Sequence, residues 1–140
     1  MINIIDTRDL IEERDASLEE LRAFLYDLYK IEIEKFEDLK KLNDFQKGKY
    51  KEDKDILQLI NIITEINNLE EEVGTEFQYG VTLISKNYFV DYVKDFVTDC
   101  GYIPRNLPHW IEVNWESTAE NLKVDYIETV FRDLEFYFGG

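Results

Sequence analysis

The 140-residue chain contains a single Cys, a single His, a single Met and only two Pro. One cysteine excludes an intramolecular disulfide framework, and one Cys with one His excludes a zinc site built from those side chains. Long apolar runs are also missing, because no stretch approaches the roughly 18 apolar residues that span a bilayer. The first residues lack the basic and apolar segments of a secretory signal. We therefore expect a cytoplasmic protein with no membrane partner.

Basic residues are scarce relative to acids. Lys and Arg number 16 against 31 Asp and Glu, which gives a net charge of -15 and a pI near 4.4. A surface this negative repels phosphate, so we expect no direct binding of nucleic acid through a basic face. Hydrophobic residues make up 44% of the chain, enough to bury a core and to exclude a wholly disordered protein.

The first half of the chain has the repeating apolar pattern of amphipathic helices. Residues 17–20 have the form of a capping box, in which Ser17 and Glu20 satisfy the first backbone N–H groups of a helix. Asp6 or Thr7 is expected to begin a shorter helix before this one. The apolar stripe that follows the capping box has the three- and four-residue spacing of one helix face, and consists of Leu18, Leu21, Leu25 and Leu28.

After a change of phase, the apolar stripe resumes over residues 36–45. Residues 46–51 lack helical periodicity and contain a glycine, which predicts an exposed loop. A second stripe follows over residues 56–73, and Gly74 lies where a helix commonly ends. Two amphipathic helices joined by a short loop bury their stripes against each other, so we predict an antiparallel helical hairpin within residues 1–74.

Residues 75–140 have a different composition, because the last 64 residues hold 14 of the 20 aromatic side chains. A helix is predicted over residues 88–100, where Gly101 ends it. A shorter helix is predicted over residues 115–122, with Asn114 as its N-cap.

Two β-rich segments, residues 126–131 and 134–138, flank a two-residue turn and predict a β-hairpin packed on these helices. The predicted fold class is therefore α+β, mainly α. A helical hairpin region (residues 1–74) precedes a small, aromatic-rich α+β unit (residues 75–140) that ends in the β-hairpin.

No pattern in the sequence predicts catalysis. His109 lies between Pro108 and Trp110 without a nucleophile or acid in a recognisable motif, which favours a structural histidine over a catalytic one. Cys100 closes an apolar helix and is expected to be a buried structural thiol. A glycine-rich phosphate loop and a nucleophile elbow are both absent from the sequence. We expect a protein without catalytic residues, metal ligands or cofactors.

The acids of the second half recur at a regular spacing. A separation of four residues places side chains on one helix face at intervals of about 6 Å, and carboxylates at that spacing repel one another. Regular rows of carboxylates imitate the phosphates of DNA, and a basic groove that binds DNA would then bind them. The alternative is an acidic face that only keeps the protein soluble. The candidate binding residues are Asp91, Asp95, Asp99, Glu112, Glu116 and Glu120.

Short segments at both ends of the chain carry a resemblance to a known family. Ile5–Ile11 is similar to an "I-D-S-R-D" opening, and Tyr79–Ile84 to a "Y-G-x-T-L-I" entry into a C-terminal unit. Both patterns are typical of phage and mobile-element proteins related to the ArdA antirestriction family, which this chain resembles. The resemblance extends over Tyr88–Tyr92, Asp99–Gly101, Trp115–Leu122 and Asp125–Tyr126.

The resemblance implies a protein that imitates DNA and occupies a host restriction–modification complex inside the bacterial cytoplasm. ArdA proteins are elongated, acidic and usually dimeric, with three small domains, whereas the first two thirds of this chain are predicted to be helical. Another nuclease-based defence system, such as a CRISPR effector nuclease, is a further candidate target.

The alternative hypothesis is a non-catalytic helical module that binds a protein partner or forms a homodimer. In that case the apolar stripe formed by Leu18, Leu21, Leu25 and Leu28 makes the contact, and the negative charge only keeps the chain soluble.

Overall fold

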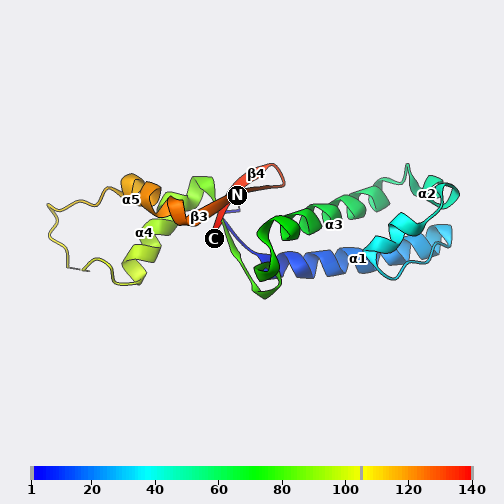
Figure 1. Ribbon diagram of the computed structural model, residues 1–140, viewed down its shortest axis with the longest axis horizontal. Helices are drawn as coiled ribbons and strands as arrows, with labels where there is room; N and C mark the ends of the chain where they lie inside the picture. Colours follow the sequence, from blue (N-terminus) through cyan, green and yellow to red (C-terminus); the bar gives the residue numbers. More distant parts are fainter. Residues whose placement is uncertain (1, 105, 140) are drawn as a thin grey trace. The chain divides into compact units, whose positions relative to one another are not determined.

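A computed structural model describes residues 2–104 and 106–139, and its fold is α+β, mainly α, as predicted (Figure 1). The chain forms two compact units. Arg8–Gln78 form the helical unit, and the described residues on either side of them form the sheet unit. The elements in chain order are β1 (Ile4–Asp6), α1 (Thr7–Tyr29), η1 (Phe36–Lys41), α2 (Asp44–Tyr50), α3 (Lys54–Val73), η2 (Thr75–Tyr79), β2 (Thr82–Ser85), η3 (Lys86–Tyr88), α4 (Phe89–Asp99), α5 (Trp115–Leu122), η4 (Lys123–Asp125), β3 (Tyr126–Phe131) and β4 (Leu134–Gly139).

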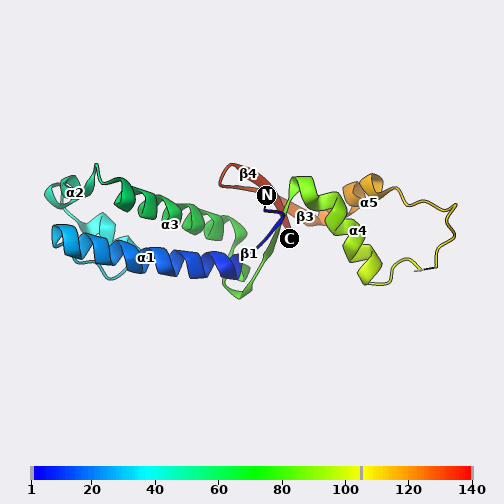
Figure 2. The same ribbon diagram turned by 180° about the vertical axis from the view of Figure 1, so that it is seen from behind.

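In the helical unit, α1 and α3 lie side by side and antiparallel (Figure 1 and Figure 2). Near the start of α1, the Arg14 guanidinium donates to the Glu70 carboxylate of α3 at 2.9 Å. At the other end of α1, the Tyr29 hydroxyl donates to Asp53 at 2.6 Å, immediately before α3. The apolar faces of both helices meet in a core that contains Leu21, Leu25, Ile56, Leu59 and Ile63.

The predicted capping box at residues 17–20 is wrong, because α1 runs unbroken from Thr7 to Tyr29. Ser17 lies in the middle of this helix and is buried. The separate leading helix expected from Asp6 or Thr7 is therefore the first part of α1. The physical reason is that residues 8–16 contain no Gly or Pro to interrupt the helix.

The segment between α1 and α3 also differs from the prediction. Residues 46–51 were expected to form a loop, but α2 occupies Asp44–Tyr50. Its start is fixed by a reciprocal capping box, in which the Asn43 side chain accepts from the Gln46 amide at 2.8 Å and the Gln46 side chain accepts from the Asn43 amide at 3.1 Å. Its end is fixed by Tyr50, whose ring is buried in the core.

The predicted helix over residues 56–73 is confirmed as α3. Asp53 caps it, because one carboxylate oxygen accepts the amides of Asp55 at 3.1 Å and Ile56 at 3.2 Å. Gly74 ends it at φ 95°, a conformation that glycine adopts without steric cost.

The sheet unit is built on a four-stranded antiparallel sheet in the order β1-β2-β4-β3. The predicted hairpin is confirmed as β3 and β4, and its turn has positive φ at Arg132 and Asp133, as a tight hairpin requires. Strands β1 and β2 were not predicted. Since β1 pairs with β2, the first residues of the chain belong to the sheet unit, whereas the sequence placed them in the helical region.

Helices α4 and α5 cover one face of this sheet (Figure 1). The Phe89 ring of α4 lies 4.8 Å from the Tyr137 ring of β4 and 5.1 Å from the Tyr126 ring of β3, measured between ring centroids. Val93 and Ala119 complete the contact with Ile84 of β2. Across the described part of the chain, every helix is too short or too polar to cross a membrane.

The burial of α1 predicts unequal effects of two leucine substitutions. Leu25 is 0% exposed and Leu28 is 61% exposed, although they lie one turn apart on the same helix. Leu25→Ala should lower the free energy of unfolding by about 2–5 kcal/mol, because it leaves a cavity in the core. Leu28→Ala should change it by less than about 0.5 kcal/mol. Urea denaturation of both variants measures the difference, and equal losses would contradict this packing.

The pairing of Tyr29 with Asp53 predicts a pH-dependent contribution to stability. The Tyr29 hydroxyl, followed by the Ile56 and Asp55 amides, holds the pKa of Asp53 below its ordinary value of 3.8. A carboxyl whose pKa is lowered by folding stabilises the folded state above its unfolded pKa, and this contribution is lost as the pH falls through the folded pKa.

Asp53→Asn keeps an N-cap acceptor but removes the charge. The variant should be less stable than the parent chain at pH 7, and the difference should shrink as the pH falls from about 5 to 2. Urea midpoints at several pH values measure this convergence. Tyr29→Phe is the matched control, and should show the same trend with a smaller loss; a difference that does not vary with pH would contradict the interaction.

Candidate interaction surface

The acids that were predicted to form a binding surface lie in the sheet unit, on and beside α4 and α5. Local sequence fixes the ends of both helices. The Asn114 side chain accepts from the Ser117 amide at 3.1 Å and caps α5, as predicted. Gly101 follows the end of α4 at φ 74°, which a residue with a side chain rarely adopts. The inward faces of the helices are apolar, so the acids are left on the outward faces.

Three of the predicted acids are brought together by the fold. Asp91, Glu112 and Glu116 line a surface hollow of about 560 Å³, which we call the acidic hollow. Asp91 comes from α4, Glu116 from the first turn of α5, and Glu112 from the segment just before α5. All six predicted acids are exposed: Asp91, Asp95, Asp99, Glu112, Glu116 and Glu120.

The other three predicted acids do not line the acidic hollow. Asp95 and Asp99 follow Asp91 along α4 by one and two turns. Glu120 forms an ion pair with Lys123 at 3.4 Å, one turn further along the chain. Tyr137 and then Glu120 raise the pKa of Lys123, so this ammonium stays charged and neutralises Glu120. The structure therefore divides the set into an acidic hollow, two further acids on α4, and one paired acid.

Few cations balance the acidic hollow. Lys94 is the one basic side chain among the described residues that line it. Lys86, elsewhere in the sheet unit, is engaged by Glu128 at 3.3 Å and by Glu135 at 3.5 Å. Within residues 2–104 and 106–139, the three carboxylates of the hollow form no ion pair. A cationic partner would thus meet carboxylates that have no competing partner among the described side chains.

A row of aromatic rings begins on α4 with the partly buried Tyr92 and with Phe96, and continues at Tyr102, beyond the end of that helix. The Tyr92 and Phe96 rings are nearly parallel, with centroids 6.4 Å apart and an interplanar angle of 10°. The Tyr102 ring follows at 6.2 Å from Phe96. Phe96 is 36% exposed and Tyr102 is 71% exposed, so α4 and the residues just after it present both aromatic and acidic groups to their surroundings.

The groups with potential reactivity are dispersed. Among the described residues, no three His, Cys, Asp or Glu side chains are placed to hold a metal ion. His109 is exposed in the irregular segment between α4 and α5. Cys100 was predicted to be a buried thiol, and this is wrong: it is exposed, because it lies beyond the last helical turn, after the residues of α4 that face the sheet.

The four leucines of the alternative hypothesis lie in the helical unit. Leu21 and Leu25 are fully buried in its core, and Leu18 packs partly against that core. Leu28 is exposed. Most of the stripe is thus buried within the helical unit, and Leu28 is the one leucine of the four whose side chain is exposed to solvent.

Sequence reasoning missed the residues that complete the acidic hollow. Lys94 and Trp115 line it together with Val90 and Val113. The four-residue spacing of the acids did not predict these residues, because such a spacing relates positions within one helix and says nothing of which segments pack together. The position of Asn114 as a helix cap was the available signal that residues 112–116 form the turn at which α5 begins.

No protein-family model, curated protein or solved structure matches this chain. The resemblance to the ArdA family, which rests on short segments such as Tyr79–Ile84, therefore remains a prediction from the sequence.

Proposed function

We propose that this chain is a non-catalytic inhibitor of a host DNA-targeting defence system. Its acidic α4–α5 surface binds the basic, DNA-binding groove of a restriction–modification complex or of a CRISPR effector nuclease, and thereby competes with DNA. The observation that carries the proposal is the acidic hollow. There Asp91 of α4, Glu116 of α5 and Glu112 of the segment before α5 come together without an ion pair among the described residues.

The electrostatic cost of this arrangement supports a binding role. Like charges held close together raise the free energy of the folded unit, and a cationic partner removes that repulsion on binding. A groove that has evolved to bind phosphates offers Lys and Arg side chains at high density. Complementary charge of this kind mainly increases the association rate and the selectivity for the right partner.

The aromatic side chains beside the acids support a protein partner. Protein interfaces are enriched in Tyr, Phe and Trp, and these side chains supply much of the binding energy. The exposed rings of Phe96 and Tyr102 provide such area next to the carboxylates of α4. A face that served only for solubility would not need exposed aromatic rings, because apolar surface lowers solubility.

The alternative, a helical module that binds through its leucine stripe, has less support. Leu21 and Leu25 already fill the core of the helical unit, so their use in a dimer would require that unit to open. Dimerisation through other surfaces is compatible with the proposal, because two copies would extend the acidic surface.

A competition assay tests the proposed function. Labelled DNA is bound to a type I restriction–modification complex and, separately, to a Cas9–guide complex, and the chain is titrated into each. Release of DNA from at least one complex supports the proposal and identifies the target class. Retention of DNA by both complexes at low salt would exclude both targets.

Neutral substitutions in the acidic hollow should weaken inhibition. The triple variant Asp91→Asn, Glu112→Gln, Glu116→Gln should reduce potency by about tenfold or more, because it removes three carboxylates from the contact. The matched control is Glu71→Gln, Glu72→Gln, Glu76→Gln, which changes the net charge equally at exposed positions of the helical unit.

The control variant should inhibit as well as the parent chain in the same titration. If both triple variants lost potency equally, the effect would come from net charge and the assignment of the contact to the acidic hollow would be wrong.

Inhibition should also weaken as salt rises. Attraction between exposed charges is screened over about 10 Å at 0.1 M ionic strength, and over about 3 Å at 1 M. The apparent affinity for the target complex, measured from 50 to 500 mM KCl by fluorescence anisotropy of labelled chain, is expected to fall steadily. An affinity that does not change with salt would favour an apolar contact.

A further inference from the structure

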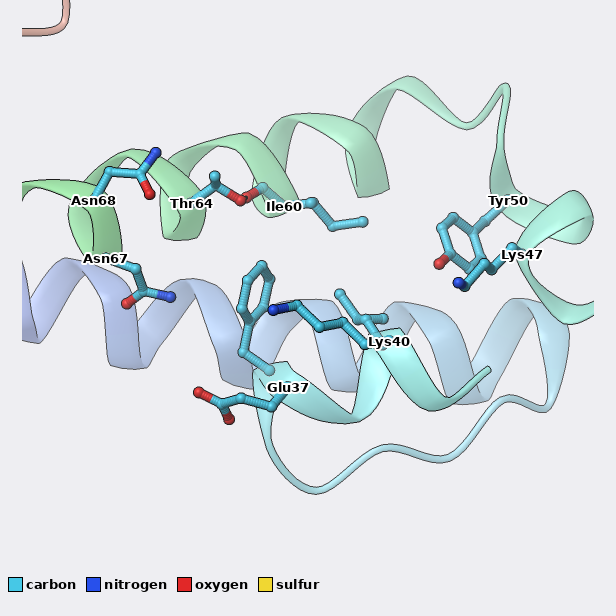
Figure 3. A pocket seen from close by; sticks show the side chains of 10 residues that line it. Glu37, Lys40, Lys47, Tyr50, Ile60, Thr64, Asn67 and Asn68 are labelled. Atoms are coloured by element: carbon cyan, nitrogen blue, oxygen red, sulfur yellow. The ribbon is translucent and has the colours of Figure 1, made fainter. Parts of the chain in front are cut away.

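A second hollow, distinct from the acidic one, lies within the helical unit between η1, α2 and α3 (Figure 3). Its volume is about 450 Å³, which is within the usual range for small-molecule sites. We call it the apolar groove, because most of its lining is carbon. The apolar lining is supplied by Phe36, Leu39, Tyr50 and Ile60.

The polar side chains of the apolar groove include two ammonium groups and one carboxylate, that of Glu37. Lys47 lies beside the Tyr50 ring at one end, and the side chain of Lys40 extends along the groove between η1 and α3 (Figure 3). Asn67 and Asn68 of α3 lie toward the other end (Figure 3). Among the described residues neither lysine forms an ion pair with a carboxylate.

The surroundings of the groove favour an anion. Residues 30–54 contain eight Lys and seven acids, whereas the whole chain has a net charge of -15. The side of the groove formed by η1 and α2 thus lies in the segment where an anionic group is least repelled. The two ammonium groups of the lining outnumber its single carboxylate, Glu37. Burial raises the pKa of the neighbouring Tyr50, so its hydroxyl is neutral at pH 7 and adds no negative charge.

We infer that the apolar groove binds a small amphiphile with one carboxylate, such as a medium-chain fatty acid. The apolar body lies against Phe36, Leu39 and Ile60, and the carboxylate lies between the ammonium groups of Lys40 and Lys47. Apolar area supplies the affinity and the two lysines supply the orientation. The groove is bounded by η1 and α2 as well as α3, which suits a compact ligand better than a helix of several turns. This site is independent of the function proposed for α4 and α5.

The test uses sodium decanoate, below its critical micelle concentration, titrated into the full ¹⁵N-labelled chain. Amide signals of the groove residues should shift progressively and saturate, while signals of α4 and α5 stay in place. Decanol is the uncharged control ligand, and it should bind several-fold more weakly because it lacks the carboxylate. Shifts confined to other regions, or no shift at all, would overturn the inference.

Two pairs of substitutions test the role of the lysines. Lys40→Gln with Lys47→Gln should weaken decanoate binding by about three- to tenfold and leave decanol binding unchanged. The control pair is Lys41→Gln with Lys49→Gln, since Lys41 lies beside Asp38 and Lys49 lies over the Phe45 ring, both outside the groove lining.

The control pair should bind decanoate like the parent chain. All four lysines are exposed, so the variants should fold normally, and circular dichroism verifies this. Equal losses in both pairs would overturn the carboxylate site. Shifts of the groove residues by an acidic amphipathic peptide, without any shift by decanoate, would overturn the proposed ligand class in favour of a peptide.

Discussion

Thr7 is fully buried where β1 ends and α1 begins, and its reciprocal pairing with Val81 fixes the start of the helical unit. The Thr7 amide donates to the Val81 carbonyl at 3.0 Å, and the Val81 amide donates to the Thr7 hydroxyl at 2.8 Å. These two bonds join residues 74 positions apart and continue directly into the pairing of β1 with β2. The helical unit is therefore a long insertion between two adjacent strands. Pairing β1 with β2 closes this long insertion into a loop, which lowers the conformational entropy of the chain. The core that α1 and α3 form with each other has to offset that loss.

Each unit uses its apolar residues internally and leaves a chemically different surface. In the sheet unit, Phe89, Val93 and Ala119 hold α4 and α5 on the sheet, and the acids remain outside. In the helical unit, the short elements η1 and α2 cover the core incompletely and leave the apolar groove beside Lys40 and Lys47. A strongly acidic chain thus carries one anionic surface and one apolar groove with two lysines in its lining, each within a single unit.

The elements that the sequence predicted well are those with strong local signals. Helix α3 has a regular apolar stripe and Gly74 at its end, α5 has Asn114 as its cap, and the β3–β4 hairpin has a two-residue turn. Strands β1 and β2 have three and four residues, too few for a period to be visible, and long-range pairing decides their structure. The acids of the acidic hollow were predicted from their spacing, but the hollow itself was not. The sequence pattern did not show that acids of α4 and acids at the start of α5 lie close together.

Hydrogen–deuterium exchange tests the central claim most directly, because it locates the contact on the chain without mutation. Exchange would be compared for the free chain and for the chain mixed with a restriction–modification complex or a Cas9–guide complex. Binding through the acidic surface predicts slower amide exchange over Phe89–Asp99 and Trp115–Leu122 with at least one complex, and unchanged exchange over Lys54–Val73. Unchanged exchange over α4 and α5 with both complexes, or protection confined to the helical unit, would contradict the proposed function.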